Sequence, residues 1–123
     1  MPKPGATGLR RIVDAAGYSM KGFQAAWRNE SAFRQEATVA VILVPCAFLL
    51  GRNTTEVVLL LITLAIVLVS ELLNSAIEAV VDRTGEEINV LSGRAKDMAS
   101  SAVFVALALV VIVWGLVAWD RFG

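Results

Sequence analysis

The sequence contains no histidine and one cysteine, Cys46, among its 123 residues. The lack of histidine excludes histidine general bases, Ser-His catalytic triads and imidazole metal ligands. The single cysteine excludes an internal disulfide and a cysteine-rich metal site. Any metal that this chain binds must therefore be held by oxygen ligands, which favours Mg²⁺ or a similar hard cation.

Charge is also scarce, because charged residues make up 18% of the chain while hydrophobic residues make up 57%. The mean hydropathy is +0.69. A soluble domain of this size exposes much of its surface to water and normally carries more charge. The composition therefore excludes an ordinary soluble globule and indicates a membrane protein. Eleven basic and eleven acidic residues balance, so no excess of positive charge points to nucleic acid as a partner.

Long uncharged runs predict three membrane-spanning helices. The run at residues 98–119 is long enough to cross a bilayer core unaided and predicts a span at residues 97–119, with Asp97 at its start. Two shorter runs predict spans at residues 31–51 and 54–83, once they are extended into polar flanking residues. The whole chain is thus predicted to be a single all-α membrane domain.

The distribution of Lys and Arg predicts the orientation of these spans. With the N-terminus inside, nine of the eleven basic residues lie on the cytoplasmic side and two on the other side. The loop at residues 84–96 is then cytoplasmic, and the turn at 51–56 lies on the opposite side, with Thr54 or Thr55 as the N-cap of the second span. Three aromatic residues are expected at that outer interface: Trp114, Trp119 and Phe122.

The segment at residues 9–29 carries one narrow apolar stripe at helical spacing. It predicts an amphipathic helix that lies on the cytoplasmic membrane surface, or alternatively packs against its own protein. The stripe consists of Leu9, Ile12, Val13, Ala16, Met20, Phe23 and Trp27. Residues 1–8 are expected to be disordered.

The second predicted span carries polar side chains along one helical face. Glu71, Asn74, Glu78 and Asp82 follow one another at steps of 3, 4 and 4 residues. Carboxylates within a membrane are costly and are retained where they face a protein interior, a wet cleft, a cation or a basic partner. The pattern favours an ion or proton site, and the alternative is a polar contact between helices.

A second group of charges lies on the cytoplasmic side. Glu30 stands between the surface helix and the first span, and Arg94, Lys96 and Asp97 stand near the start of the third span. Acids and bases at one interface could hold a metal and a phosphate together, or they could be ordinary solvated flanking charges. The chain has no Walker A loop, no dinucleotide fingerprint and no protein-kinase motif set. Any nucleotide site must therefore have an unrelated architecture.

Several segments together are similar to a known family. They are AAGYS at 15–19, NE at 29–30, AFRQE at 32–36, ELLNSAIEAVVDR at 71–83 and LSGRAKDM at 91–98. In this combination they resemble the small bacterial integral-membrane diacylglycerol kinases. The likeness extends from about residue 8 to the final Phe-Gly.

The resemblance implies a fold and an activity. The expected molecule is an all-α homotrimer, with three transmembrane helices and one N-terminal amphipathic surface helix per subunit. Its active sites would be shared between subunits on the cytoplasmic side of the bacterial inner membrane. The expected reaction is the MgATP-dependent phosphorylation of the hydroxyl of 1,2-diacylglycerol to phosphatidic acid.

The resemblance also implies roles for individual residues. Glu71 resembles the catalytic base, and Glu30 and Glu78 resemble the ligands of Mg²⁺. The expected nucleotide contacts are Arg11, Tyr18, Glu30, Glu78, Glu87, Lys96 and Asp97. The expected lipid-side or supporting residues are Ala32, Phe33, Arg34, Gln35, Glu36, Asn74 and Ser100.

Other functions are compatible with the residues. A related kinase could phosphorylate another lipid alcohol, such as undecaprenol. A small cation- or proton-conducting oligomer could be lined by Glu71, Glu78 and Asp82, although this leaves the basic cytoplasmic loop without a role. A non-catalytic membrane scaffold would tolerate the substitution Glu71→Gln.

Overall fold

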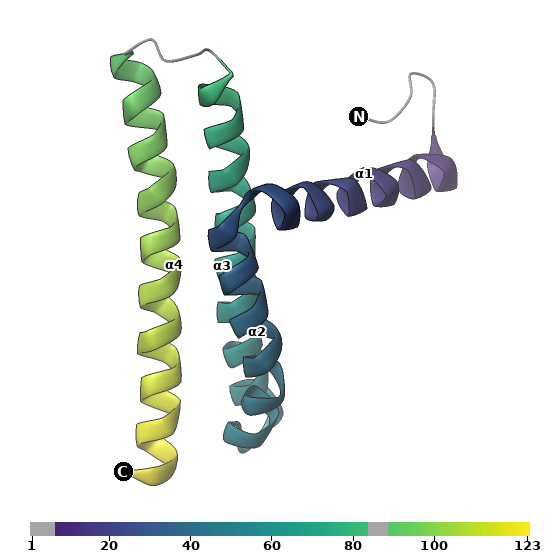
Figure 1. The fold of residues 1–123 in the computed structure, drawn as a ribbon. Helices are drawn as coiled ribbons and strands as arrows, with labels where there is room; N and C mark the ends of the chain where they lie inside the picture. Colours follow the sequence, from purple (N-terminus) through teal and green to yellow (C-terminus); the bar gives the residue numbers. More distant parts are fainter. Residues whose placement is uncertain (1–6, 84–88) are drawn as a thin grey trace.

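The computed structural model describes residues 7–83 and 89–123. These residues form four α-helices: α1 (Gly8–Asn29), α2 (Ser31–Leu50), α3 (Thr54–Asp82) and α4 (Val90–Phe122). Figure 1 shows α2, α3 and α4 running alongside one another, whereas α1 projects away from them. The last three helices are long and apolar enough to cross a membrane. The predicted all-α membrane fold with three spanning helices is therefore confirmed.

The start of α3 differs from its prediction in one detail. The N-cap is Asn53, whose side-chain oxygen accepts a hydrogen bond of 2.9 Å from the backbone N–H of Glu56. The expectation of Thr54 or Thr55 as the cap is wrong, because Asn53 already supplies a short polar side chain in the extended conformation that a cap requires.

The start of α4 differs more. The predicted loop to residue 96 and the predicted helix start at Asp97 are wrong, because α4 begins at Val90. The side-chain oxygen of Asn89 accepts hydrogen bonds from the backbone N–H groups of Leu91 at 2.8 Å and Ser92 at 3.1 Å. This cap satisfies amides that would otherwise lack partners, so the helix forms before the apolar run begins. The rest of the predicted loop, residues 84–88, lies outside the described residues, as do residues 1–6.

The half of the bundle that contains the turn between α2 and α3 is held by small apolar contacts and by a hydrogen bond between α4 and α3. Ala47, Leu60 and Val117 form a buried cluster from the three spanning helices, with Trp114 packed against it. The indole Nε1 of Trp114 donates to Thr63 Oγ1 at 2.9 Å. Trp114 therefore points into the bundle rather than lying at the outer interface as expected, while Trp119 is 76% exposed.

The C-terminus is tied to the turn between α2 and α3. Arg121 Nη1 donates hydrogen bonds of 2.6 and 2.8 Å to the last two carbonyl groups of α2. Arg52 forms ion pairs with Glu56, at 2.8 Å, and with Asp120. These contacts bring the end of α2, the start of α3 and the end of α4 to one level.

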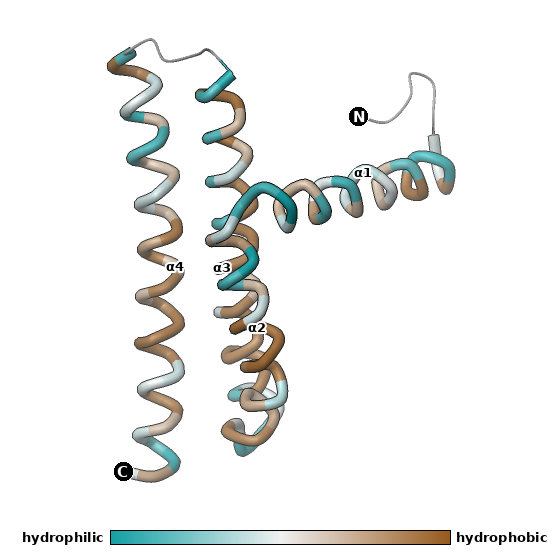
Figure 2. Tube along the Cα trace, in the orientation of Figure 1, coloured by the Kyte–Doolittle hydropathy of each residue, from teal (hydrophilic) through white to brown (hydrophobic). Residues whose placement is uncertain are grey.

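The three spanning helices differ in length. At 1.5 Å per residue, the 20 residues of α2 extend about 30 Å, the 29 of α3 about 44 Å and the 33 of α4 about 50 Å. Because the three helices are level at the turn between α2 and α3, α3 and α4 continue beyond the start of α2 by about 14 to 20 Å. Figure 2 shows this extension as less hydrophobic than the middle of the bundle. A bilayer core is about 30 Å thick, so α3 and α4 are longer than one crossing requires.

Candidate functional site at one end of the bundle

A single residue, Glu30, separates the surface helix from the first span. Its backbone is extended, with φ −121° and ψ 105°. Its N–H donates to the carbonyl of Ala26 at 2.9 Å, and its own carbonyl accepts from the N–H of Arg34 at 3.2 Å. The half-buried side chain of Glu30 is thus fixed at the point where α1 joins the bundle.

The helix α1 is attached to the rest of the chain through its C-terminal end. Ala26 is its buried residue among those described. The predicted apolar stripe is largely exposed, with its large side chains ranging from 77% exposed at Leu9 to 46% at Phe23. Within one chain, therefore, the stripe is not covered by the other helices.

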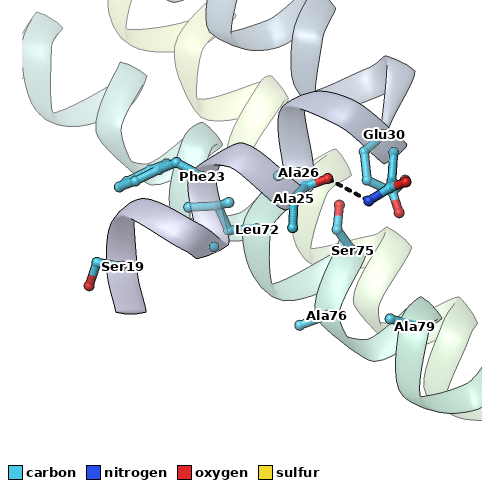
Figure 3. Close-up of a pocket in the computed structure, with 11 residues that line it drawn as sticks. Ser19, Phe23, Ala25, Ala26, Glu30, Leu72, Ser75, Ala76 and Ala79 are labelled. Atoms are coloured by element: carbon cyan, nitrogen blue, oxygen red, sulfur yellow. Dashed lines mark hydrogen bonds between the residues drawn. The ribbon is translucent and has the colours of Figure 1, made fainter. Parts of the chain in front are cut away.

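A pocket of about 600 Å³ lies between α1 and α3. Apolar side chains such as Phe23 and Leu72 line most of it, and Glu30 and Ser75 contribute polar groups. Figure 3 shows Glu30 and Ser75 toward one end of this pocket and Ser19 toward the other. The hydroxyl of Ser75 is buried and has no hydrogen-bond partner in the described structure. Sequence reasoning missed Ser75, because a single serine on an apolar helix gives no signal of a pocket.

The predicted acidic face of α3 changes in burial along its length. Glu71 is 3% exposed, Glu78 is half-buried and Asp82 is exposed. Asn74 Nδ2 donates a long hydrogen bond of 3.4 Å to Glu78 Oε1. The face therefore leads from a carboxylate enclosed by protein to one in contact with solvent.

Glu30 lines the same pocket as Ser75 and Ala79 of α3, and the acidic face of that helix acts on it electrostatically. Burial raises the pKa of Glu30, and the negative charges of Glu78, Glu71 and Asp82 raise it further, in that order. Within residues 7–83 and 89–123, no ion pair involves Glu30, Glu71 or Glu78. The three carboxylates thus repel one another without a protein cation to offset their charge.

A basic side chain from α4 joins the same end of the bundle. Lys96 Nζ lies 3.1 Å from Asp82 Oδ1 and forms an ion pair with it. Asp97 and Ser100 are exposed on α4. This end therefore combines the carboxylates with one ammonium group.

Two predicted nucleotide contacts lie away from this cluster. Arg11 and Tyr18 are exposed on α1, and their 19- and 12-residue separations from Glu30 correspond to about 28 and 18 Å along a helix. The ammonium of Lys21 lies 5.8 Å from the centre of the Tyr18 ring. Glu87, also predicted as a nucleotide contact, lies outside the described residues.

The predicted lipid-side segment 32–36 has mixed environments. Phe33 is 5% exposed and packs inward, whereas Ala32 and Gln35 are exposed. Glu36 is half-buried, and its Oε2 has no hydrogen-bond partner among the described residues. The guanidinium of Arg34 turns back to the end of α1, so this side chain contacts backbone carbonyls of its own chain.

The residues fit a metal bound together with phosphate. Among the described residues, no group of three or more metal-ligating side chains gathers at one point. Mg²⁺ is usually held by one or two carboxylates together with water and phosphate oxygens. Glu30 and Glu78 interact electrostatically and form no ion pair with any residue that the structure describes, so they meet this requirement.

The helices and this site define a membrane-spanning protein with an acidic site and an adjoining apolar pocket at one end of its spans. The comparison of sequences gives the family: the chain belongs to the prokaryotic diacylglycerol kinases, whose family model matches residues 17–118.

Relatives of similar length are named diacylglycerol kinase. A diacylglycerol kinase of Escherichia coli (strain K12) is 51% identical over 117 residues, which cover 95% of this chain and 96% of the relative. One from Pseudomonas aeruginosa is 49% identical over 116 residues, covering 94% of each chain. One from Haemophilus influenzae is 49% identical over 109 residues, covering 89% of this chain and 92% of the relative. The similarity thus includes all four helices.

Proposed function

We propose that this chain is a lipid kinase that transfers the γ-phosphoryl group of MgATP to the hydroxyl of 1,2-diacylglycerol, giving phosphatidic acid. The observation that carries the proposal is the buried carboxylate of Glu71, which lies on the same face of a membrane-spanning helix as Glu78 and acts electrostatically on Glu30. Membership of the prokaryotic diacylglycerol kinase family supports the same activity.

In the proposed reaction, Glu71 accepts the proton of the lipid hydroxyl. The hydroxyl oxygen forms a bond to the γ-phosphorus while the bond from that phosphorus to the bridging oxygen of ADP breaks. The carboxylate of Glu71 is enclosed by protein, on a helix that is long and apolar enough to cross a membrane. Its role is therefore to remove a proton where water is scarce.

The metal site is proposed at Glu30 and Glu78. Mg²⁺ bound there supplies positive charge to the β- and γ-phosphates. Lys96, held beside Asp82, is placed to offset the charge of the same phosphates. The nucleotide would extend from this end along α1, with Tyr18 nearer the phosphates than Arg11, and Asp97 and Glu87 would complete its contacts.

The pocket between α1 and α3 is proposed to hold the lipid. Its lining is mostly apolar and ends at Glu30 and Ser75. The exposed apolar stripe of α1 would rest in the membrane interface, so a lipid could enter sideways from the bilayer. The remaining supporting positions are Ala32, Gln35, Glu36, Asn74 and Ser100.

We further propose a homotrimer in the bacterial inner membrane with its N-terminus in the cytoplasm. The excess of basic residues on the N-terminal side supports this orientation. The long apolar faces of α3 and α4 that remain exposed in one chain, including Val69, Phe104 and Ile112, leave room for contacts between subunits.

The test is turnover in lipid micelles containing Mg²⁺, with diacylglycerol and undecaprenol compared as acceptors. We expect diacylglycerol-dependent ATP consumption that falls by about 10² to 10⁴-fold in Glu71→Gln, the usual contribution of a general base. Asp120→Asn is the matched control, since it removes a carboxylate at the outer end of the bundle.

The outcomes separate the candidate functions. Turnover with undecaprenol alone would keep phosphoryl transfer and change the substrate. Normal turnover in Glu71→Gln would remove Glu71 from its role as base. No turnover with either lipid, from protein shown to be folded, would refute the kinase, and ion flux in vesicles would then be measured.

A further inference from the structure

Carbonyl groups at the C-terminal end of α1 accept hydrogen bonds from side chains and from the residue that follows the helix. The last carbonyl groups of a helix have no partners within it. Here the carbonyl of Ala25 accepts from Asn29 Nδ2 at 2.9 Å, and that of Ala26 accepts from the backbone N–H of Glu30 at 2.9 Å. The next two carbonyl groups, of residues 27 and 28, are reached by a side chain from the following helix.

That side chain is Arg34, from the first turn of α2. Its Nη1 donates to the carbonyl of Trp27 at 2.7 Å and to that of Arg28 at 3.3 Å. A positive charge is favourable at a helix C-terminus, where the helix dipole is negative. The guanidinium therefore caps one helix while its backbone belongs to the next, and it bridges the one-residue break between them.

Glu30 is the residue enclosed by this bridge. Its backbone N–H donates a hydrogen bond to the carbonyl of Ala26 in α1, and its carbonyl accepts one from the backbone N–H of Arg34 in α2. The guanidinium of Arg34 forms no ion pair within the described residues. Arg34 thus restrains the backbone at Glu30 without forming an ion pair with its carboxylate, and Glu30 remains at the end of the pocket that it lines together with Ser75 and Ala79 of α3.

We propose that Arg34 is a positioning residue for the metal site: by capping α1 it fixes the junction that holds Glu30 beside α3, the helix that carries Glu78. This assignment rests on the proposed function, since it takes Glu30 and Glu78 as the ligands of Mg²⁺. It gives Arg34 a role distinct from contact with lipid.

The first test uses metal-free protein and does not depend on activity. Hydrogen exchange of the Glu30 amide, measured by mass spectrometry on peptides covering residues 25–34, should become about tenfold faster in Arg34→Met, because that variant leaves two helix-end carbonyls without a charged donor. Arg34→Lys should restore part of the protection. Arg28→Met is the matched control, since it removes a cation from the same helix end without removing this cap, and its exchange should equal that of the wild type.

The second test measures metal binding. In Arg34→Met the Mn²⁺ affinity of the protein in micelles, followed by electron paramagnetic resonance, and the Mg²⁺ concentration for half-maximal turnover should each shift by about tenfold. Turnover at saturating Mg²⁺ and the half-saturating diacylglycerol concentration should stay within about twofold of the wild type. Arg34→Lys should recover part of the metal affinity.

Each other result overturns the assignment. A weaker apparent affinity for diacylglycerol with unchanged metal affinity would make Arg34 a lipid contact. A parallel loss of Tm, lipid affinity and turnover would make Arg34 a purely structural residue. Unchanged exchange of the Glu30 amide in Arg34→Met would refute the capping role of Arg34. If the wild type binds Mn²⁺ and shows no turnover with either lipid, the kinase proposal fails while exchange and Mn²⁺ binding still decide the role of Arg34.

Discussion

The hydrogen bond between Trp114 and Thr63 offers a direct measure of what holds α3 to α4. Thr63→Val keeps the shape of the side chain but removes the acceptor of the indole N–H at 2.9 Å, together with the hydroxyl's own bond to the carbonyl of Leu60 at 2.7 Å. Thr63 is 2% exposed, so solvent does not replace the lost acceptor.

The expected loss of unfolding free energy is about 1 to 2 kcal/mol. Interhelical hydrogen bonds in membranes contribute about 0.6 kcal/mol on average and about 1.7 at most, and a buried donor left without a partner costs about 1 to 3 kcal/mol. The added methyl group of valine recovers some apolar contact, which holds the total to the lower part of this range.

The assay is unfolding by sodium dodecyl sulfate in mixed micelles, for Thr63→Val, Trp114→Phe and the double variant. The double variant should be less destabilised than the sum of the single ones, with a coupling of about 1 kcal/mol. Turnover should be unchanged, since eight residues, or about 12 Å of helix, separate Thr63 from Glu71. A change below about 0.3 kcal/mol in Thr63→Val, or strict additivity, would refute this account of the contact.

Three further predictions concern helix ends and the acidic site. Asn89→Ala should cost about 1 kcal/mol of unfolding free energy through loss of the α4 cap, measured in the same assay against Ser100→Ala. Gly51→Ala should lower the free energy of unfolding by about 1 to 3 kcal/mol, because a Cβ there would lie 2.6 Å from a methyl group of Val57 and 2.9 Å from its backbone nitrogen. An unchanged midpoint of unfolding by sodium dodecyl sulfate would contradict this. Since the pKa of Glu30 is raised, the folded state holds this proton more tightly than the unfolded chain, so metal-free protein should gain stability as pH falls from about 8 toward its ordinary pKa of 4.5. Glu30→Gln should reduce that gain in thermal unfolding, and an identical pH profile would contradict the assignment.

The spans could be predicted from the sequence because their signal is long and local. The uncharged run at 98–119 is long enough by itself to cross a bilayer core of about 20 residues, and the two shorter runs indicated the other spans once they were extended into polar flanking residues. The acidic face of α3 was likewise readable from the 3- and 4-residue steps after Glu71. The sequence did not predict that Glu71 is buried and Asp82 is exposed, because regular spacing does not show what packs opposite each residue.

Helix ends and junctions were less predictable. The charges at Arg94, Lys96 and Asp97 resemble a loop when the apolar run alone defines a span, yet the capping side chain of Asn89 starts the helix earlier. The contact of Arg34 with the end of α1 depends on how two helices meet across a break. Such an arrangement is a three-dimensional property that no periodicity in the sequence expresses.

The unequal lengths of the spanning helices connect the acidic site to the thickness of the bilayer. α2 extends about 30 Å, close to the hydrocarbon core itself, and its start directly follows Glu30. A thinner bilayer favours a tilted α2 and a thicker one an upright α2, whereas α3 projects past the core in either case. Glu30 would then shift relative to Glu78 as acyl chains shorten or lengthen. We therefore expect the Mg²⁺ requirement to be lowest in bilayers whose core matches α2 and to rise on both sides of that match.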